Sequence, residues 1–221
     1  MRKRQRSFGE KLINKFNPKK EKILIEEVQK EIERFVFENE VNCKGYVFPK
    51  ILTNITFSFK YVIFNKNIDF SSIIFEYNAE FNMAIFRGGT DFRGATFKQN
   101  ANFYGVTFEL ACFDEATFKG DAIFNDSTFK FAEFMNAIFE KNAEFIRCSF
   151  TNGEFRSAVF RGNVYFDFAK FTRADFTYAK FEGRDNWFNS TEFLVKLTLE
   201  KLNLRTLRGS IQQNLKSLIL D

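Results

Sequence analysis

Phenylalanine recurs at steps of five or six residues through the middle of the chain, from Phe59 to Phe181. The residue two positions before most of these phenylalanines is alanine or another small or β-branched residue, as with Ala95 before Phe97. Two inward positions per unit, one small and one large, fit a short strand and a turn, because alternate strand residues face the same side. An α-helix would scatter these side chains around its axis. The pattern therefore predicts a series of short β-strands.

Four of these units make one larger period. The steps first alternate five and six, which sums to 22 for four units, and from Phe103 they run 5, 5, 5, 6, which sums to 21. A chain that closes at this period stacks its turns about 4.8 Å apart and places every fourth phenylalanine in one interior column. The predicted core stack contains Phe81, Phe103, Phe124, Phe145 and Phe166. Phe59 should begin this column and Trp187 should extend it.

The sixth residue of the longer units is asparagine or aspartate on one face. These residues are Asn78, Asn100, Asp121, Asn142 and Asn163. Asparagine and aspartate tolerate turn geometry, and their side chains bond to nearby backbone. The spacing therefore predicts a ladder of these side chains along one corner of the coil.

At this point the sequence resembles the pentapeptide-repeat family, whose unit is a small residue, any residue, a central leucine or phenylalanine, and two more residues. The units at 95–99 (ATFKQ), 116–120 (ATFKG) and 137–141 (AIFEK) match it, and the resemblance covers residues 57–188. It implies an all-β fold, a right-handed quadrilateral parallel β-helix (solenoid) of about six coils, often capped by helices, often dimeric through its C-terminus, and not catalytic. The six-residue units should appear as bulges at the corners.

The chain is expected to divide into four parts. Residues 1–18 form a basic amphipathic segment, 19–56 an N-terminal helix and cap, 57–188 the β-helix, and 189–221 a C-terminal helical cap or dimerisation segment. Leucine replaces phenylalanine in the last part, and the seven-residue spacing of its apolar positions suits a helix seam. The candidate dimer or cap contacts are Leu197, Leu204, Ile211 and Leu218. A cap folded onto the coil and a homodimer contact both remain open.

Composition removes most catalytic chemistry. The 221 residues include 34 Phe, no His and three Cys. Without histidine there is no Ser-His-Asp triad, no Cys-His pair and no HExxH zinc site. The odd cysteine number argues against a disulfide framework, and no signal peptide or membrane span is indicated, so we expect a cytoplasmic protein. No cofactor or metal is expected.

The charge is uneven along the chain. Residues 1–56 carry 13 Lys and Arg against 8 acids, whereas residues 57–188 carry 15 against 17. The basic segment, through residues 1–20, suggests contact with an anionic membrane, nucleic acid or a partner; a frayed or docked terminal helix is the alternative.

One predicted face carries a column of acids immediately before its phenylalanines. The members are Asp69, Asp91, Glu133, Glu154 and Asp175, with Cys112 interrupting the row. Like charges about 5 Å apart repel by roughly 0.8 kcal/mol per pair in water, so Arg93 and Arg156 are expected to compensate,. The column is either a solvated ladder with local ion pairs or a surface for a basic partner. A neighbouring face, the mixed-charge face, carries both signs, which predicts ion pairs in solvent. Its members are Glu76, Lys98, Lys119, Glu140, Arg161 and Glu182.

The pattern favours a non-catalytic scaffold that binds another macromolecule through its faces. Within the resembled family, quinolone-resistance members bind DNA gyrase and are thought to mimic DNA by shape and negative charge. This resemblance offers a sharper alternative, a topoisomerase-binding protein that protects against quinolone-type poisons. A third alternative is a module tethered to membrane or nucleic acid by its basic N-terminus.

Overall fold

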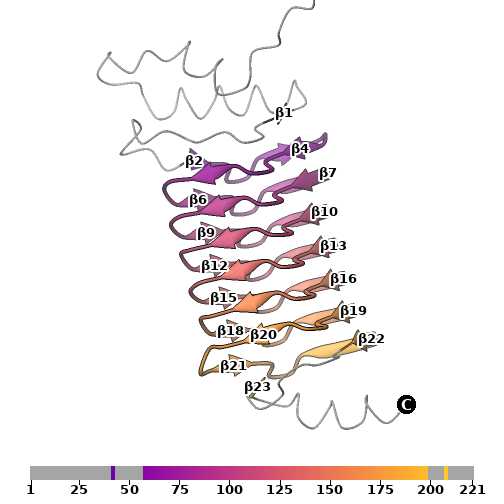
Figure 1. The fold of residues 1–221 in the computed structure, drawn as a ribbon. Coiled ribbons are helices and arrows are strands. Elements are labelled where there is room, and N and C mark those ends of the chain that lie inside the picture. Colours follow the sequence, from indigo (N-terminus) through magenta and orange to yellow (C-terminus); the bar gives the residue numbers. More distant parts are fainter. Residues whose placement is uncertain (1–40, 43–56, 199–206, 209–221) are drawn as a thin grey trace, which may run out of the picture.

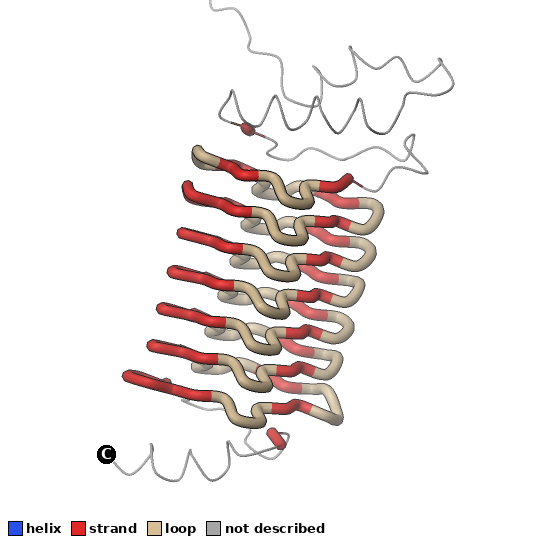
Figure 2. The backbone as a smooth tube through the Cα atoms, turned by 180° about the vertical axis from the view of Figure 1, so that it is seen from behind, coloured by secondary structure: helices blue, strands red, loops and turns tan. Residues whose placement is uncertain are grey.

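A computed structural model of the chain describes residues 41–42, 57–198 and 207–208, and every regular element in this part is a β-strand. The chain winds as an all-β parallel solenoid of about six coils, whose strands stack in ladders along its length (Figures 1 and 2). No helix in the described part could cross a membrane. The basic segment 1–18 and the helix predicted within 19–56 lie outside the described residues.

Three parallel sheets run along the solenoid. Sheet A contains β1 (Val41–Asn42), β4 (Ile68–Asp69), β7 (Ile85–Asp91), β10 (Thr107–Cys112), β13 (Thr128–Glu133), β16 (Ser149–Glu154), β19 (Lys170–Asp175) and β22 (Glu192–Thr198), and β3 (Ile63–Phe64) also pairs with β7. Sheet B contains β5 (Ile74–Phe75), β8 (Thr96–Phe97), β11 (Thr117–Phe118), β14 (Ile138–Phe139), β17 (Val159–Phe160) and β20 (Lys180–Phe181). Sheet C contains β2 (Phe57–Ser58), β6 (Ala79–Glu80), β9 (Ala101–Asn102), β12 (Ala122–Ile123), β15 (Ala143–Glu144), β18 (Val164–Tyr165), β21 (Asn186–Trp187) and β23 (Leu207–Arg208). The long strands of sheet A each serve two successive repeat units.

The interior consists of four columns of stacked phenylalanine rings. In the predicted core stack, neighbouring ring centroids are 4.8–4.9 Å apart and nearly parallel. Rings of this column meet those of the opposite column edge to face, as Phe124 meets Phe134 at 5.6 Å and 85°. Alanine occupies most of the small inward positions, where a larger side chain would separate the rings; Ala101, Ala122 and Ala143 are aligned and fully buried.

Two kinds of corner close each coil. After two of the columns the chain makes a tight turn, in which the second residue after phenylalanine has positive φ and the third donates its N–H to the phenylalanine carbonyl. At Phe124, for example, Asp126 has φ 61° and Ser127 N lies 3.1 Å from Phe124 O. Most of these positions hold residues other than glycine, even the bulky Phe168 (φ 58°). Coil closure therefore overrides the local preference for glycine.

The second kind of corner contains the predicted asparagine–aspartate ladder, which is confirmed. Each side-chain oxygen accepts a hydrogen bond from the backbone N–H of its counterpart in the next coil. Asn163 N, for instance, donates to Asn142 Oδ1 at 3.2 Å, and Asp185 N donates to Asn163 Oδ1 at 3.1 Å. The ladder satisfies backbone donors that the sheets leave unpaired at this corner.

Replacing Asn142 with alanine should lower the free energy of unfolding by about 1–3 kcal/mol, because the partly buried Asn163 N–H loses its acceptor,. The change to aspartate keeps an acceptor oxygen and should cost less. Urea unfolding of both variants measures the difference. Equal losses for the two variants would show that the hydrogen bond is not the cause.

The last coil departs from the predicted register. Trp187 was expected to extend the core stack, but Phe188 stacks on Phe166 instead, with ring centroids 5.0 Å apart. The reason is a longer final corner, in which Asn186 takes the small inward position and donates from Nδ2 to Gly183 O at 2.9 Å. Trp187 therefore faces outward.

The segment from residue 189 also begins differently from the prediction. Glu192–Thr198 forms strand β22 and not the start of a helix, because Phe193 stacks on Phe171 at 5.2 Å and continues a column. The prediction of bulges is confirmed only in part: β7 and β22 shift register against their neighbours, whereas the six-residue units at the second kind of corner contain the ladder.

Candidate functional site

The acidic column lies on the outer side of sheet A, in register from coil to coil. Asp69 is paired with Asp91 across the ladder, and Glu154 with both Glu133 and Asp175. Cys112 occupies the same row between Asp91 and Glu133. The structure therefore brings all five predicted acids into one line along one face.

The aspartates of this column also shape the backbone. Asp69 Oδ1 accepts a hydrogen bond from Ser71 N at 2.9 Å, and Asp175 Oδ1 accepts one from Thr177 N at 2.8 Å. Asp91 makes the same contact with Arg93 N at 2.9 Å. Such turns favour aspartate over glutamate, whose longer side chain fits them less well. Part of the acidic signal in the sequence is therefore structural.

Arginines neutralise part of the column, as predicted. Arg93 Nε lies 3.0 Å from both carboxylate oxygens of Asp91, and this contact raises the pKa of the Arg93 guanidinium. Arg156 Nε lies 3.3 Å from Glu154 Oε2 and 3.8 Å from Asp175 Oδ2. Within residues 57–198, neither Asp69 nor Glu133 takes part in an ion pair. The N-terminal half of the column thus keeps more of its charge.

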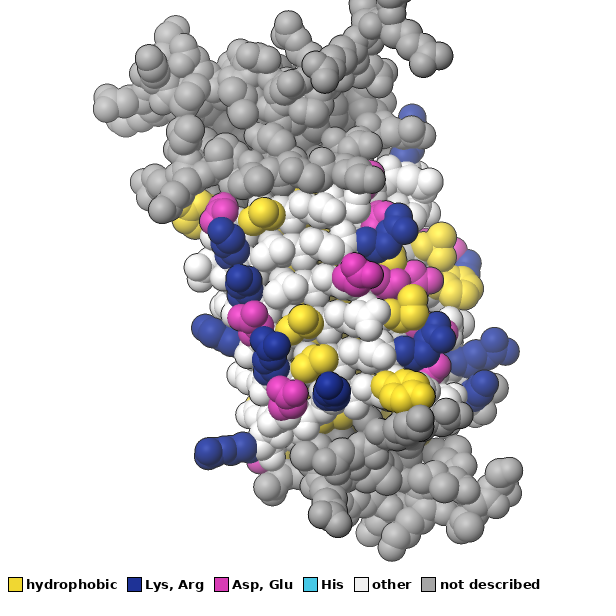
Figure 3. Space-filling view, viewed as in Figure 1, with side chains coloured by type: hydrophobic (Ala, Val, Ile, Leu, Met, Phe, Trp, Pro, Cys, Tyr) yellow, Lys and Arg dark blue, Asp and Glu magenta, His cyan; other side chains and the backbone are white. Residues whose placement is uncertain are grey.

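A groove of about 590 Å³ follows this half of the column. Its lining includes the carboxylates of Asp69, Asp91, Asp114 and Glu133, the guanidinium of Arg93, and the apolar side chains of Leu110 and Phe131. Leu110 and Phe131 are 47% and 42% exposed. Figure 3 shows such acidic and hydrophobic side chains together on the right-hand side of the molecule.

Sequence reasoning missed the apolar wall of this groove. Leu110 and Phe131 are adjacent across β10 and β13, and Gly89 occupies the same row on β7. The row then turns polar or basic at Asn152 and Arg173. The signal in the sequence is a row of outward positions in register, each one residue before a small inward residue.

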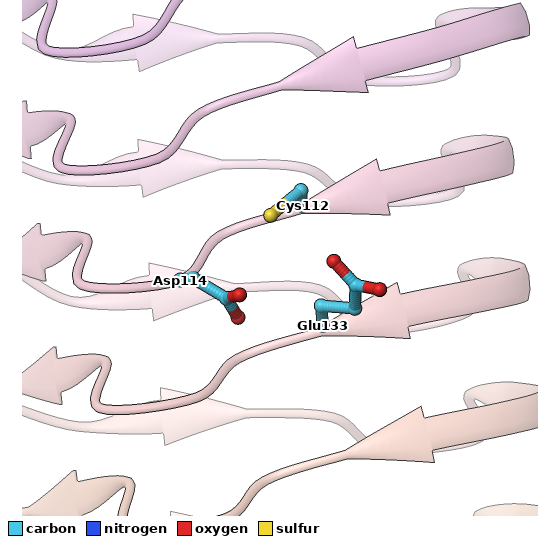
Figure 4. Close-up of side chains that lie close together, drawn as sticks. All are labelled: Cys112, Asp114 and Glu133. Atoms are coloured by element: carbon cyan, nitrogen blue, oxygen red, sulfur yellow. The ribbon is translucent and has the colours of Figure 1, made fainter.

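Three groups within the groove are close enough to share a metal ion. The ligand atoms of Cys112, Asp114 and Glu133 lie within 4.8 Å of one another, pointing toward each other from neighbouring coils (Figure 4). Burial, above all, raises the pKa of the Cys112 thiol to about 12, and hydrogen bonding and the charge of Glu133 contribute. Burial also raises the pKa of Asp114. Cys112, Asp114 and Glu133 thus form a hydrogen-bonded polar cluster in the groove.

Replacing Glu133 with glutamine should speed the alkylation of Cys112. Loss of the carboxylate removes both a hydrogen bond and a negative charge that raise the thiol pKa, so more thiolate is present at a given pH,. Rates measured from pH 7 to 10 in a Cys43→Ser background test this. Cys148 is the internal control, because it is 1% exposed and should stay unreactive. An unchanged Cys112 rate would contradict the assigned cause.

The structure describes some of the remaining predicted contacts and not others. On the mixed-charge face, Lys98 pairs with Glu76 at 2.8 Å and Arg161 with Glu140 at 3.8 Å, which confirms ion pairing in solvent. Leu197 lies in β22 opposite Ala174 and packs against the core. The other candidate dimer or cap contacts, Leu204, Ile211 and Leu218, lie outside the described residues.

The parallel ladders and the four phenylalanine columns define a β-solenoid repeat protein. A family model described as pentapeptide repeats (9 copies) matches residues 70–111 and 108–149. The match covers residues 70–149 and confirms the resemblance to pentapeptide repeats seen in the sequence. No curated protein matches the chain.

Proposed function

We propose that this protein is a non-catalytic scaffold that binds another macromolecule through the faces of its solenoid. The observation that carries the proposal is the acidic column, five carboxylates in register along sheet A with one interruption at Cys112. The strands that carry these side chains enclose a densely packed interior, so the backbone loses little conformational freedom when a partner binds. A basic partner is the natural complement of this surface.

The proposed binding is tested with full-length variants that remove charge and keep shape. Changing Asp69, Asp91 and Asp175 to asparagine, and Glu133 and Glu154 to glutamine, preserves acceptor oxygens for the turns. Glu76→Gln, Glu140→Gln and Glu182→Gln, which remove three carboxylates from the mixed-charge face, make the control. Partners captured by the natural chain and by the control should be lost from the five-site variant. Equal capture by all three would refute the acidic column as the contact.

The absence of catalysis is part of the proposal. The carboxylates lie in an open groove, the thiol pKa of Cys112 is raised to about 12, and the sequence has no histidine. A closed site with matched acid and base groups is what hydrolysis would need. Hydrolytic turnover that disappears in the Asp91→Asn and Glu133→Gln variants would overturn this part.

A second candidate is binding to DNA gyrase or another topoisomerase, with protection from quinolone-type poisons. The regular row of carboxylates along a rod favours it, whereas the ion pairs of Arg93 and Arg156 weaken its negative charge. In a supercoiling assay, the natural chain should inhibit or protect gyrase and the five-site variant should not. Unchanged supercoiling with and without the protein would exclude this candidate.

We also propose that the coils form a right-handed quadrilateral, since four interior phenylalanine columns fit four sides. Helical ends, a homodimer contact through the C-terminus, and contact of residues 1–20 with an anionic membrane or nucleic acid remain proposals. Sedimentation with and without liposomes or DNA, over a range of salt, tests the last of these. A cytoplasmic location is proposed because the cysteine number is odd and Cys112 and Cys148 are free thiols.

A further inference from the structure

The acidic groove combines two properties that a solvated ladder does not need. It carries four carboxylates and one guanidinium, a formal charge of −3 from −4 and +1. Beside these charges Leu110 and Phe131 hold large apolar surfaces nearly half exposed to solvent. Adjacent apolar side chains at the rim of a charged groove indicate a binding surface for an amphipathic ligand.

The start of the described chain lies at one end of this groove. Strand β1 pairs with β4 so that Asn42 stands next to Asp69, in the same row as the acidic column. The 40 residues before Val41 therefore join the fold at the N-terminal end of the groove.

The first 16 residues have the complementary chemistry. They contain six Lys and Arg against one acid, Glu10. Their apolar residues are Phe8, Leu12, Ile13 and Phe16, whose spacing predicts one apolar face of a helix,. Both the charge and the apolar surface of the groove are thus matched within the same chain.

The connection is long enough. From Asp69 to Glu133 the groove spans three coil steps, about 15 Å at the interstrand spacing. Residues 17–40 extend about 36 Å even if they are entirely helical, at 1.5 Å per residue,. The N-terminal segment can therefore reach any point of the groove.

We propose that residues 1–16 dock in the acidic groove of the same molecule, with lysines and arginines on Asp91, Asp114 and Glu133 and the apolar face on Leu110 and Phe131. The contact places a tethered ligand on the surface that a basic partner would use. Its regulatory consequence, competition between the segment and the partner, rests on the proposed function. The contact itself does not.

Carbodiimide cross-linking of the full-length protein tests the contact, because it joins lysine amines only to carboxylates in direct contact. The expected products join Lys11 or Lys15 to Asp91, Asp114 or Glu133, and their yield should fall as salt is raised. A mixture of isotope-labelled and unlabelled protein separates contacts within one molecule from those between two. Mixed-isotope products alone would assign the groove to a second copy and overturn the proposal.

Two full-length variants and a control sharpen the test. Asp114→Asn with Glu133→Gln should reduce cross-linking at the remaining Asp91 about tenfold, the effect of losing two exposed ion pairs. Leu110→Ser with Phe131→Ser keeps every charge and should also reduce it. Glu140→Gln with Glu182→Gln should leave it unchanged. Products spread evenly over the acids of all faces, or none at all, would refute the proposal. The cross-linking experiment contains no partner, so such a result would not test partner binding, which the capture experiment with the five-site variant tests separately.

Discussion

Replacing Phe124 with alanine is expected to lower the free energy of unfolding by about 3–5 kcal/mol. The Phe124 ring is fully buried and stacks between Phe103 and Phe145, with both centroids 4.9 Å away. It also meets Phe113 and Phe134 edge to face at 5.6 Å. Alanine would leave a cavity that neighbouring coils cannot fill, because their own hydrogen-bonded strands fix their spacing. Guanidinium chloride unfolding measures the loss.

The matched control for this change is Phe131→Ala. Phe131 is seven residues further along the chain, but its side chain is 42% exposed on the outer side of β13. Replacing it with alanine should therefore change the free energy of unfolding by roughly 0.5 kcal/mol or less. Similar losses at Phe124 and Phe131 would contradict the assignment of inward and outward positions. Because contacts in a solenoid are made mainly between neighbouring coils, a defect at Phe124 should also broaden the unfolding transition.

Replacing Gly88 with alanine is expected to lower the free energy of unfolding by about 2–3 kcal/mol. A Cβ atom at Gly88 would lie 2.5 Å from the Lys66 carbonyl carbon and 2.7 Å from the Asn67 nitrogen. Both atoms belong to the backbone of the adjacent coil, so relief requires the coils to separate. Thermal and urea unfolding of the variant measure this cost.

Gly89, the next residue of β7, provides the control. Its nearest neighbour to a new Cβ would be Asn67 Oδ1 at 3.5 Å, an ordinary contact. Gly89→Ala should therefore be neutral or stabilise the protein by up to about 1 kcal/mol, because alanine restricts the unfolded chain. If Gly88→Ala and Gly89→Ala change the free energy of unfolding equally, close approach of the coils is not the reason for glycine at position 88.

The acidic column shows how structural and functional signals overlap at the surface. Asp69, Asp91 and Asp175 all bond to the backbone two residues later, so their presence is explained in part by turn geometry. Glu133 makes no such turn, and it lies in the groove beside Cys112 and Phe131. Glu133→Gln should therefore perturb the fold less than changes at these aspartates, and it is the most informative single substitution for testing partner binding.

The interior was predictable from the sequence because a fixed period leaves one set of inward positions. The alternation of alanine and phenylalanine identified the buried residues of the columns, and the spacing of Asn142 and Asn163 identified the ladder between them. The register failed only at the last corner, where Gly183 and Asn186 allow an extra residue. A corner of variable length cannot be inferred from the strands on either side of it.

The repeat, the period and the composition of the core follow from the sequence alone, because they depend on which residues recur at which steps. Which outward residues become neighbours follows only from the pairing of the coils. Leu110 and Phe131, 21 residues apart, form one apolar wall only because β10 and β13 pair in register. The ion pair of Arg156 with Asp175, and the effect of Glu133 on the pKa of Cys112, likewise depend on contacts between coils. Local periodicity fixes what is buried, whereas surface chemistry arises from contacts between coils.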